Sequence, residues 1–135
     1  MKPGAALVAI DTNVVVRYLT GDHPEQSARA RELVDNREVF VPVTVVLEAE
    51  WVLRSAYRFQ THDVVRALRA FGGLPTVTIS KAEAVAEALD HAEKGMDFAD
   101  ALHLESAARA EKLLTFDKRF ATAAGSIAPG RVEEL

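Results

Sequence analysis

Short, continuously apolar segments alternate with longer amphipathic segments along this chain, and that alternation restricts the fold more than any other feature. The apolar segments predict β-strands at 5–11, 38–42, 75–79 and 112–116, and the tail 126–135 predicts a last edge strand. Strands that are apolar throughout and separated by helices are typical of a parallel sheet covered on both faces. The sequence therefore predicts an α/β fold built on a mainly parallel sheet.

The segments between these strands carry start and stop signals for helices. Pro24 stands near a helix start, Ser80 and Glu83 have the spacing of a capping box, and Gly72 with Gly73 stops a helix. The predicted helices cover about 13–19, 24–36, 44–57, 61–71, 81–94, 97–110 and 117–124. One or two helices thus separate each predicted strand from the next.

The length of 135 residues predicts one domain, 1–135, and a composition of 49% hydrophobic and 27% charged residues predicts a globular one. No apolar run approaches the roughly 20 residues of a membrane span, and the N-terminal segment resembles a first strand rather than a signal peptide. Cysteine is absent, which excludes disulfides, thiolate zinc sites and a cysteine nucleophile and fits a soluble cytoplasmic protein. A net charge of −4 argues against coating nucleic acid by bulk attraction.

Acidic residues stand at the edges of several apolar elements. Asp11 and Asp117 directly follow predicted strands, while Glu48 and Asp100 lie inside apolar helical segments. Parallel sheets bind ligands beyond the carboxyl ends of their strands, so we expect these four side chains to share one pocket. Two carboxylates about 5 Å apart repel each other by roughly 3 kcal/mol at an effective dielectric near 20. A fold that gathers such groups usually holds a divalent cation.

Each N-terminal acid also has an ordinary structural interpretation. Asp11 could cap the helix that follows it, but Thr12 or Asn13 can also fill that position, so Asp11 is interpreted as a ligand. Glu48 shares a helix face with apolar residues and is expected to point towards the buried side or its border, whereas Glu50 is expected in solvent. The alternative for Glu48 is a salt bridge to an arginine.

The C-terminal acids are open to both interpretations. Asp97 is at least as good a helix cap as a metal ligand, while Asp100 is three residues on and borders the apolar face, which favours a ligand. Asp117 suits helix capping and metal binding about equally. Thr115 is either a hydrogen-bonding partner for a neighbouring carboxylate or simply a β-former.

Carboxylates without histidine or cysteine neighbours favour a hard cation, either Mg²⁺ or Mn²⁺. Such ions activate water and stabilise the leaving oxygen in phosphodiester hydrolysis. The four histidines lack metal-ligand spacing. His23, His62 and His91 are expected in loops or on polar faces without an identified partner. His103 could carry a proton, but a surface or subunit contact is the stronger expectation. No Ser–His–Asp pattern, P-loop or GxGxxG motif indicates another chemistry.

Two arginines and three aromatic residues are candidates for nucleic-acid contact. Arg54 and Arg58 are four residues apart on one predicted helix and could contact phosphate. Trp51, Tyr57 and Phe59 could stack on bases, although core or dimer packing is the stronger expectation for Trp51.

Four segments together resemble the PIN-domain nucleases, and within them the VapC-type toxins of toxin–antitoxin pairs: IDTNVVVRYL, PVTVVLEAEWVL, DFADALHLESA and LLTFDKRF. The resemblance spans nearly the whole chain. It implies a three-layer α/β/α sandwich with a mainly parallel central sheet, Mg²⁺ or Mn²⁺ dependence and endoribonuclease activity on RNA. It further implies a homodimer that a small cognate antitoxin protein inhibits by covering the acidic pocket.

The resemblance also assigns roles to residues. Those that match the family's metal-binding and catalytic positions are Asp11, Glu48, Asp100 and Asp117, with Asp97 as an accessory acid. Those that match its supporting polar positions are Thr12, Asn13 and Thr115. Two alternatives remain: a non-catalytic module of the same fold that holds a partner's arginine in the acidic pocket, and a DNA-directed nuclease of related fold.

Overall fold

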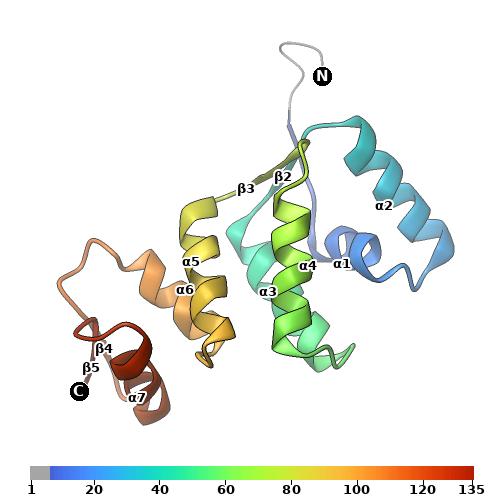
Figure 1. Ribbon diagram of the computed structural model, residues 1–135. Coiled ribbons are helices and arrows are strands. Elements are labelled where there is room, and N and C mark those ends of the chain that lie inside the picture. The colour runs from blue at the N-terminus through green and yellow to red at the C-terminus, as the bar shows by residue number, and fades with distance from the viewer. Residues whose placement is uncertain (1–6) are drawn as a thin grey trace. The chain divides into compact units, whose positions relative to one another are not determined.

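The computed structural model describes residues 7–135 and divides into two compact units, Met1–Ala82 and Glu83–Leu135 (Figure 1). Each unit has its own helices and its own parallel strand pairing. The expected single domain over 1–135 stays a prediction. Within residues 7–135, no helix combines the length and the apolar character that a membrane crossing needs.

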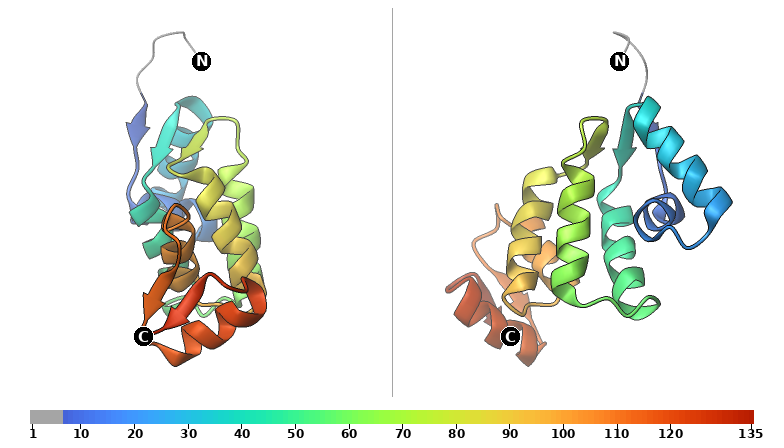
Figure 2. Two further views of the ribbon diagram at one scale, coloured as in Figure 1. Left: turned by 90° about the vertical axis from the view of Figure 1, so that its left-hand side faces the viewer. Right: turned by 45° about the vertical axis from the view of Figure 1, so that its right-hand side comes forward.

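The first unit contains a three-stranded sheet with the order β1-β2-β3, and both strand pairs are parallel. Its strands are β1 (Val8–Ala9), β2 (Val39–Val41) and β3 (Val77–Ile79). Figure 2 shows them side by side, with β2 in the centre. The side chains of Val39 and Val41 are 0% and 1% exposed, so this central strand forms part of the core. The strands are shorter than predicted, and residues 5 and 6 of the expected first strand lie outside the described residues.

Four helices of the first unit connect these strands: α1 (Thr12–Thr20), α2 (Pro24–Asn36), α3 (Val43–Ser55) and α4 (Thr61–Gly72). Helix α1 packs against α2 and α3, and α3 packs against α4. The stop at Gly72 and Gly73 is confirmed. A Cβ on Gly72 would lie 2.7 Å from the end of the Ile79 side chain, so a larger residue there would require that side chain to shift.

Helix α3 ends earlier than predicted, and this separates two arginines. Arg54 lies in its last turn, but Arg58 lies beyond the C-cap Ala56 with a φ of 58°. The expectation that Arg54 and Arg58 share one helix face is therefore wrong. The left-handed backbone at Arg58 reverses the chain after α3, which a helical wheel drawn from sequence spacing cannot anticipate.

The second unit is built from three helices and two strands: α5 (Ala82–Glu93), α6 (Phe98–Ser106), β4 (Leu113–Thr115), α7 (Lys118–Ile127) and β5 (Val132–Glu134). Strands β4 and β5 pair in parallel, and α7, which joins them, packs on both. The expected strand in the C-terminal tail is thus confirmed. The predicted α/β fold class with parallel strands is confirmed as well, and the helices and strands are consistent with a three-layer α/β/α fold.

A buried ionic cluster ties three parts of the second unit together. The Glu105 carboxylate on α6 lies 2.9 Å from His91 Nε2 on α5 and accepts a hydrogen bond of 2.8 Å from Arg131 Nη1. Arg131 also donates to the backbone carbonyl of Leu104 at 3.2 Å. The side chains of His91 and Glu105 are only 10% and 11% exposed. The expectation that His91 lies on a polar face without a partner is wrong, because its partners come from α6 and the C-terminal tail.

We expect Glu105→Ala to lower the free energy of unfolding by about 2–3 kcal/mol, because it leaves His91 and Arg131 without their shared acceptor. Urea denaturation measures this as a lower transition midpoint with an unchanged slope. Glu111→Ala is the matched control, since Glu111 is exposed in the same unit, and its effect should stay within about 0.5 kcal/mol. Similar midpoints for the two variants would contradict a stabilising role for the cluster.

Candidate functional site

The acids of the first unit lie at the edge of the sheet where β1 and β2 end. Asp11 follows β1 and is itself the N-cap of α1, with its Oδ1 accepting a hydrogen bond of 3.3 Å from the Val14 backbone nitrogen. The expectation that Thr12 or Asn13 caps this helix is wrong, because Thr12 already has helical geometry. The cap orients the Asp11 side chain and engages only one of its oxygens. Capping and ligand binding are therefore compatible for Asp11.

Glu48 on α3 meets α1 through a side-chain hydrogen bond. The Thr12 hydroxyl donates to Glu48 Oε1, and Thr12 is 8% exposed. Because β1 and β2 are parallel neighbours, the helices that follow them begin at the same sheet edge, which brings these two side chains together. Thr12 thus orients Glu48, in keeping with a supporting role.

The buried face of α3 is not the one expected from the sequence. Its buried residues are Val46, Ala49, Glu50 and Leu53, whereas Glu48 is exposed. Glu50, expected in solvent, is 3% exposed and pairs with Arg54, whose Nη2 donates to Glu50 Oε1 at 3.1 Å. The prediction for Glu50 is wrong, and Glu48 is exposed but reaches the buried Thr12, because α3 is apolar on most sides and only its tertiary partners decide which face is covered. The salt bridge to an arginine that was considered for Glu48 is formed by Glu50.

The acids of the second unit stand at two helix N-termini. Asp97 caps α6 and accepts a hydrogen bond of 3.2 Å from the Asp100 backbone nitrogen. Asp117 caps α7, accepting from the backbone nitrogens of Arg119 and Phe120 at 2.9 and 3.1 Å. Both caps were anticipated as alternatives to metal binding. Each helix end stabilises negative charge through its unpaired backbone N–H groups.

Thr115 shapes the turn that carries Asp117. Its hydroxyl accepts a hydrogen bond of 3.0 Å from the Asp117 backbone nitrogen, at the carboxyl end of β4. Thr115 therefore acts on the backbone of the acidic residue, where the sequence had predicted a bond to a carboxylate or a purely β-forming role.

Asp97, Asp100 and Asp117 line one pocket of about 360 Å³ in the second unit. Burial raises the pKa of the half-buried Asp100 above its usual value, and the negative charges of Asp97 and Asp117 raise it further, while His103 acts in the opposite direction. These three carboxylates therefore interact electrostatically. Their chemistry fits a hard divalent cation, since a bound cation would relieve this repulsion and no histidine lines the pocket.

Arg119 also lines this acidic pocket and was not among the predicted site residues. Its signal in the sequence is its place two residues after Asp117, in the first turn of α7. A guanidinium beside carboxylates can neutralise part of their charge or meet an anionic ligand.

The predicted set of acids is divided between the two units. The structure brings Glu48 to Thr12, beside Asp11, in the first unit, and Asp97, Asp100 and Asp117 together in the second. Among residues 7–135, no three Asp, Glu or His side chains are arranged as a complete metal-binding group. Asn13 lies in the first turn of α1, exposed and next to Thr12.

A model of the PIN-domain family matches residues 8–126 of the chain. The match begins in β1 and ends in α7, and it includes Asp11, Glu48, Asp100 and Asp117. PIN domains are usually nucleases and typically bind divalent metal ions. No curated protein matches the chain.

Proposed function

This chain belongs to the PIN-domain family, and on that premise we propose that it is a metal-dependent endoribonuclease acting as the toxin of a type II toxin–antitoxin system. The observation that carries the proposal is the pocket in which Asp97, Asp100 and Asp117 interact at two helix N-termini. It is rich in carboxylates and lacks histidine, which suits Mg²⁺ or Mn²⁺ and phosphodiester chemistry. A cytoplasmic setting, where RNA substrates are found, is part of the proposal.

The proposal gives each acid a role. In the second unit, Asp100 and Asp117 hold the cation and Asp97 assists them; in the first unit, Asp11 and Glu48 act as catalytic acids. A bound Mg²⁺ or Mn²⁺ would supply a water of lowered pKa and would neutralise charge on the scissile phosphate. The chain's own contribution is orientation, which the helix caps, the Thr12–Glu48 hydrogen bond and the Thr115 turn provide.

Exposed apolar side chains support the proposed protein partners, a second copy of the chain and a small antitoxin. Trp51 on α3 is 58% exposed, so it does not pack in the core and is accessible to a protein partner or a base, and Phe59 is 39% exposed. In the second unit Phe116 and Leu135 are 79% and 67% exposed. Side chains of this kind are typical of contact surfaces.

The test is cleavage of structured RNA by the purified protein. We expect cleavage with Mg²⁺ or Mn²⁺, its loss in EDTA, and its return when the metal is restored, because the proposed site has no other source of activated water. The same assay with DNA of matching sequence distinguishes a ribonuclease from a DNA-directed enzyme. Cleavage that persists unchanged in EDTA would contradict the metal-dependent mechanism.

Metal binding has a second readout that does not require activity. A cation bound only by the folded protein stabilises it by about 2.7 kcal/mol at one hundred times its dissociation constant. We therefore expect Mn²⁺ to raise the thermal midpoint by several degrees, and EDTA to reverse the rise.

The same acidic pocket could hold a partner's arginine without catalysis, since its excess negative charge also attracts a guanidinium. That alternative predicts no Mn²⁺ shift, no cleavage, and stabilisation by an arginine-rich peptide. The three measurements together therefore separate a nuclease from a binding module.

A further inference from the structure

A second pocket, of about 470 Å³, lies in the first unit between α1 and α2. Its volume falls within the roughly 300–1,000 Å³ of small-ligand sites. It is lined from α1 by Asn13, Val14 and Arg17, and from α2 by Gln26, Arg29, Ala30 and Leu33. Two arginines line it and no acidic side chain does, in contrast to the acidic pocket of the second unit.

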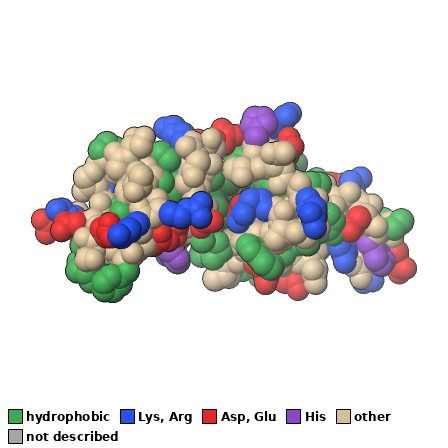
Figure 3. Space-filling model, turned by 90° about the horizontal axis from the view of Figure 1, so that it is seen from below, with side chains coloured by type: hydrophobic (Ala, Val, Ile, Leu, Met, Phe, Trp, Pro, Cys, Tyr) green, Lys and Arg blue, Asp and Glu red, His purple; other side chains and the backbone are tan. Residues whose placement is uncertain are grey.

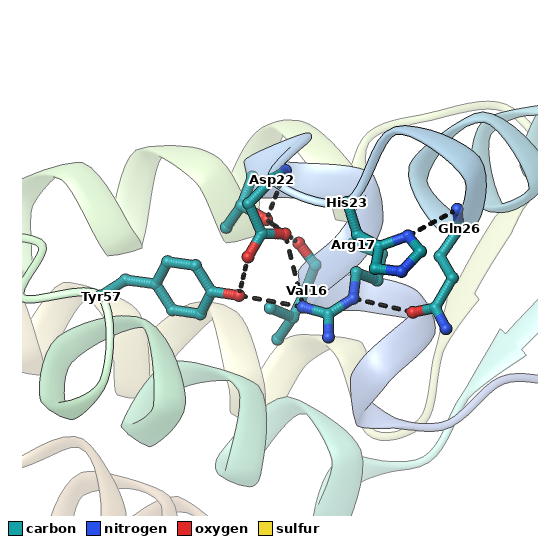
Figure 4. Close-up of polar contacts among 7 residues, drawn as sticks. Val16, Arg17, Asp22, His23, Gln26 and Tyr57 are labelled. Atoms are coloured by element: carbon teal, nitrogen blue, oxygen red, sulfur yellow. Dashed lines mark hydrogen bonds and ion pairs between the residues drawn. The ribbon is translucent and has the colours of Figure 1, made fainter.

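Arg17 is held in a fixed orientation in this pocket (Figure 4). Its Nε donates to Gln26 Oε1 at 2.9 Å, and its Nη1 donates to the Tyr57 hydroxyl at 3.0 Å and to Asp22 Oδ1 at 3.4 Å. None of these hydrogen bonds uses Nη2. The guanidinium is therefore preorganised on two of its nitrogens and keeps the third for a ligand.

Asp22 anchors this arrangement. Its carboxylate accepts hydrogen bonds from the Tyr57 hydroxyl at 2.5 Å and from the Thr20 hydroxyl at 2.7 Å. These two hydrogen bonds and the charge of Arg17 lower the pKa of Asp22, so this carboxylate stays ionised at neutral pH. Asp22 is not among the residues that line the pocket. Its carboxylate contacts Nη1 of Arg17, not Nη2.

The α2 wall supplies a second cation, and both walls supply apolar surface. Arg29 is exposed on α2 and makes no hydrogen bond or ion pair within residues 7–135. Val14, Ala30 and Leu33 provide apolar atoms beside the two guanidinium groups. A ligand that fits this lining carries a negative charge next to a flat or weakly polar body, which describes one nucleotide of an RNA strand.

We propose that this pocket binds one nucleotide of the RNA substrate, with its phosphate on Arg17 and Arg29 and its sugar or base against Val14 and Leu33. The inference rests on the proposed function, because it assigns the pocket to the same RNA. Arginine matches a phosphate with paired planar donors, and the Asn13 and Gln26 amides add polar contacts.

The pocket adjoins the end of α1 that carries a catalytic acid. Asn13 lies two residues after Asp11, which is about 3 Å along the helix axis. A strand held in the pocket would therefore pass the sheet edge where Asp11 and Glu48 lie. Basic and acidic side chains both appear on the face that Figure 3 shows. The net charge of −4 favours a local phosphate site over bulk attraction of RNA.

This pocket is also a better phosphate contact than the pair predicted from the sequence. Arg54 is engaged by the buried Glu50, and Arg58 lies outside the helix. RNA contact by Arg54 and Arg58 stays a prediction, but Arg29 has no ion pair with any of residues 7–135 that a ligand would have to break.

The test measures binding without cleavage. A fluorescently labelled RNA oligonucleotide is titrated with the full chain in EDTA at several NaCl concentrations, and anisotropy reports the dissociation constant. We expect Arg29→Ala to weaken binding about tenfold, the effect of losing one charge-assisted contact. The slope of log affinity against log salt should fall in magnitude by about 0.7, the value for one phosphate on a single strand. Arg29→Lys should keep the wild-type slope.

Arg66→Ala is the matched control, because Arg66 is exposed on α4 and does not line the pocket. It should bind RNA as the wild type does. The proposal is overturned if Arg29→Ala keeps the wild-type affinity and slope, if Arg66→Ala weakens binding equally, or if the wild type does not bind RNA. Since EDTA removes the metal, RNA binding that depends on Arg29 in a protein without cleavage activity would support the pocket and refute only the nuclease function.

Discussion

Replacing Asp100 with asparagine is expected to reduce RNA cleavage at least 100-fold, since changes even to residues behind metal ligands cost about 10- to 100-fold. Asparagine has nearly the same shape, so the variant removes the negative charge and keeps the packing in the first turn of α6. Initial rates with Mg²⁺ or Mn²⁺, at equal concentrations of folded protein, measure the loss.

The same variant is expected to keep its thermal stability in EDTA or to gain some. The folded protein raises the pKa of Asp100, so the ionised side chain disfavours folding at neutral pH. That unfavourable contribution grows as pH rises from the unfolded pKa through the folded one and is absent below both. Asparagine has no charge to be repelled by Asp97 and Asp117, so the midpoint in EDTA should not fall. The rise caused by Mn²⁺ should shrink or disappear.

Glu87→Gln is the control, since Glu87 is an exposed acid on α5 of the same unit and does not line the pocket. It should cleave RNA and respond to Mn²⁺ as the wild type does. Wild-type cleavage by Asp100→Asn would remove Asp100 from the mechanism. An undiminished Mn²⁺ response would remove it from the metal site.

Local patterning was enough to predict the order of helices and strands and the positions of several helix ends. The Gly72–Gly73 stop depends only on nearby residues. Asp97 and Asp117 cap their helices, as one of their two interpretations required. For these two acids, helix capping and metal binding do not exclude each other, because a capping carboxylate can still offer an oxygen to a cation. Two caps differ from the prediction: Asp11 caps α1 one residue earlier than expected, and α5 begins at Ala82, so Ser80 does not directly precede it as the expected cap.

Features that depend on contacts distant in sequence could not be predicted. The segment of α3 is apolar on most sides, so periodicity alone could not decide whether Glu48 or Glu50 is buried. The burial of His91 depends on Glu105, which lies on the next helix. The pocket between α1 and α2 likewise requires Tyr57, forty residues from Arg17, to orient the guanidinium.

The two glutamates of α3 should respond in opposite ways when each is changed to glutamine. Glu48→Gln is expected to reduce cleavage by about 100-fold or more and to leave stability nearly unchanged. Its amide oxygen can still accept the Thr12 hydrogen bond, so the exposed side chain loses only its charge. RNA cleavage rates and urea midpoints are measured for each variant.

Glu50→Gln is the counterpart, and it should lower the free energy of unfolding by about 1–3 kcal/mol while folded molecules keep their cleavage rate. The Glu50 side chain is 4% exposed, and the neutral amide no longer matches the Arg54 charge. The opposite outcome, with inactive Glu50→Gln and active Glu48→Gln, would assign the catalytic role to Glu50. The Glu50–Arg54 pair would then have to open for catalysis, because that carboxylate is buried and occupied.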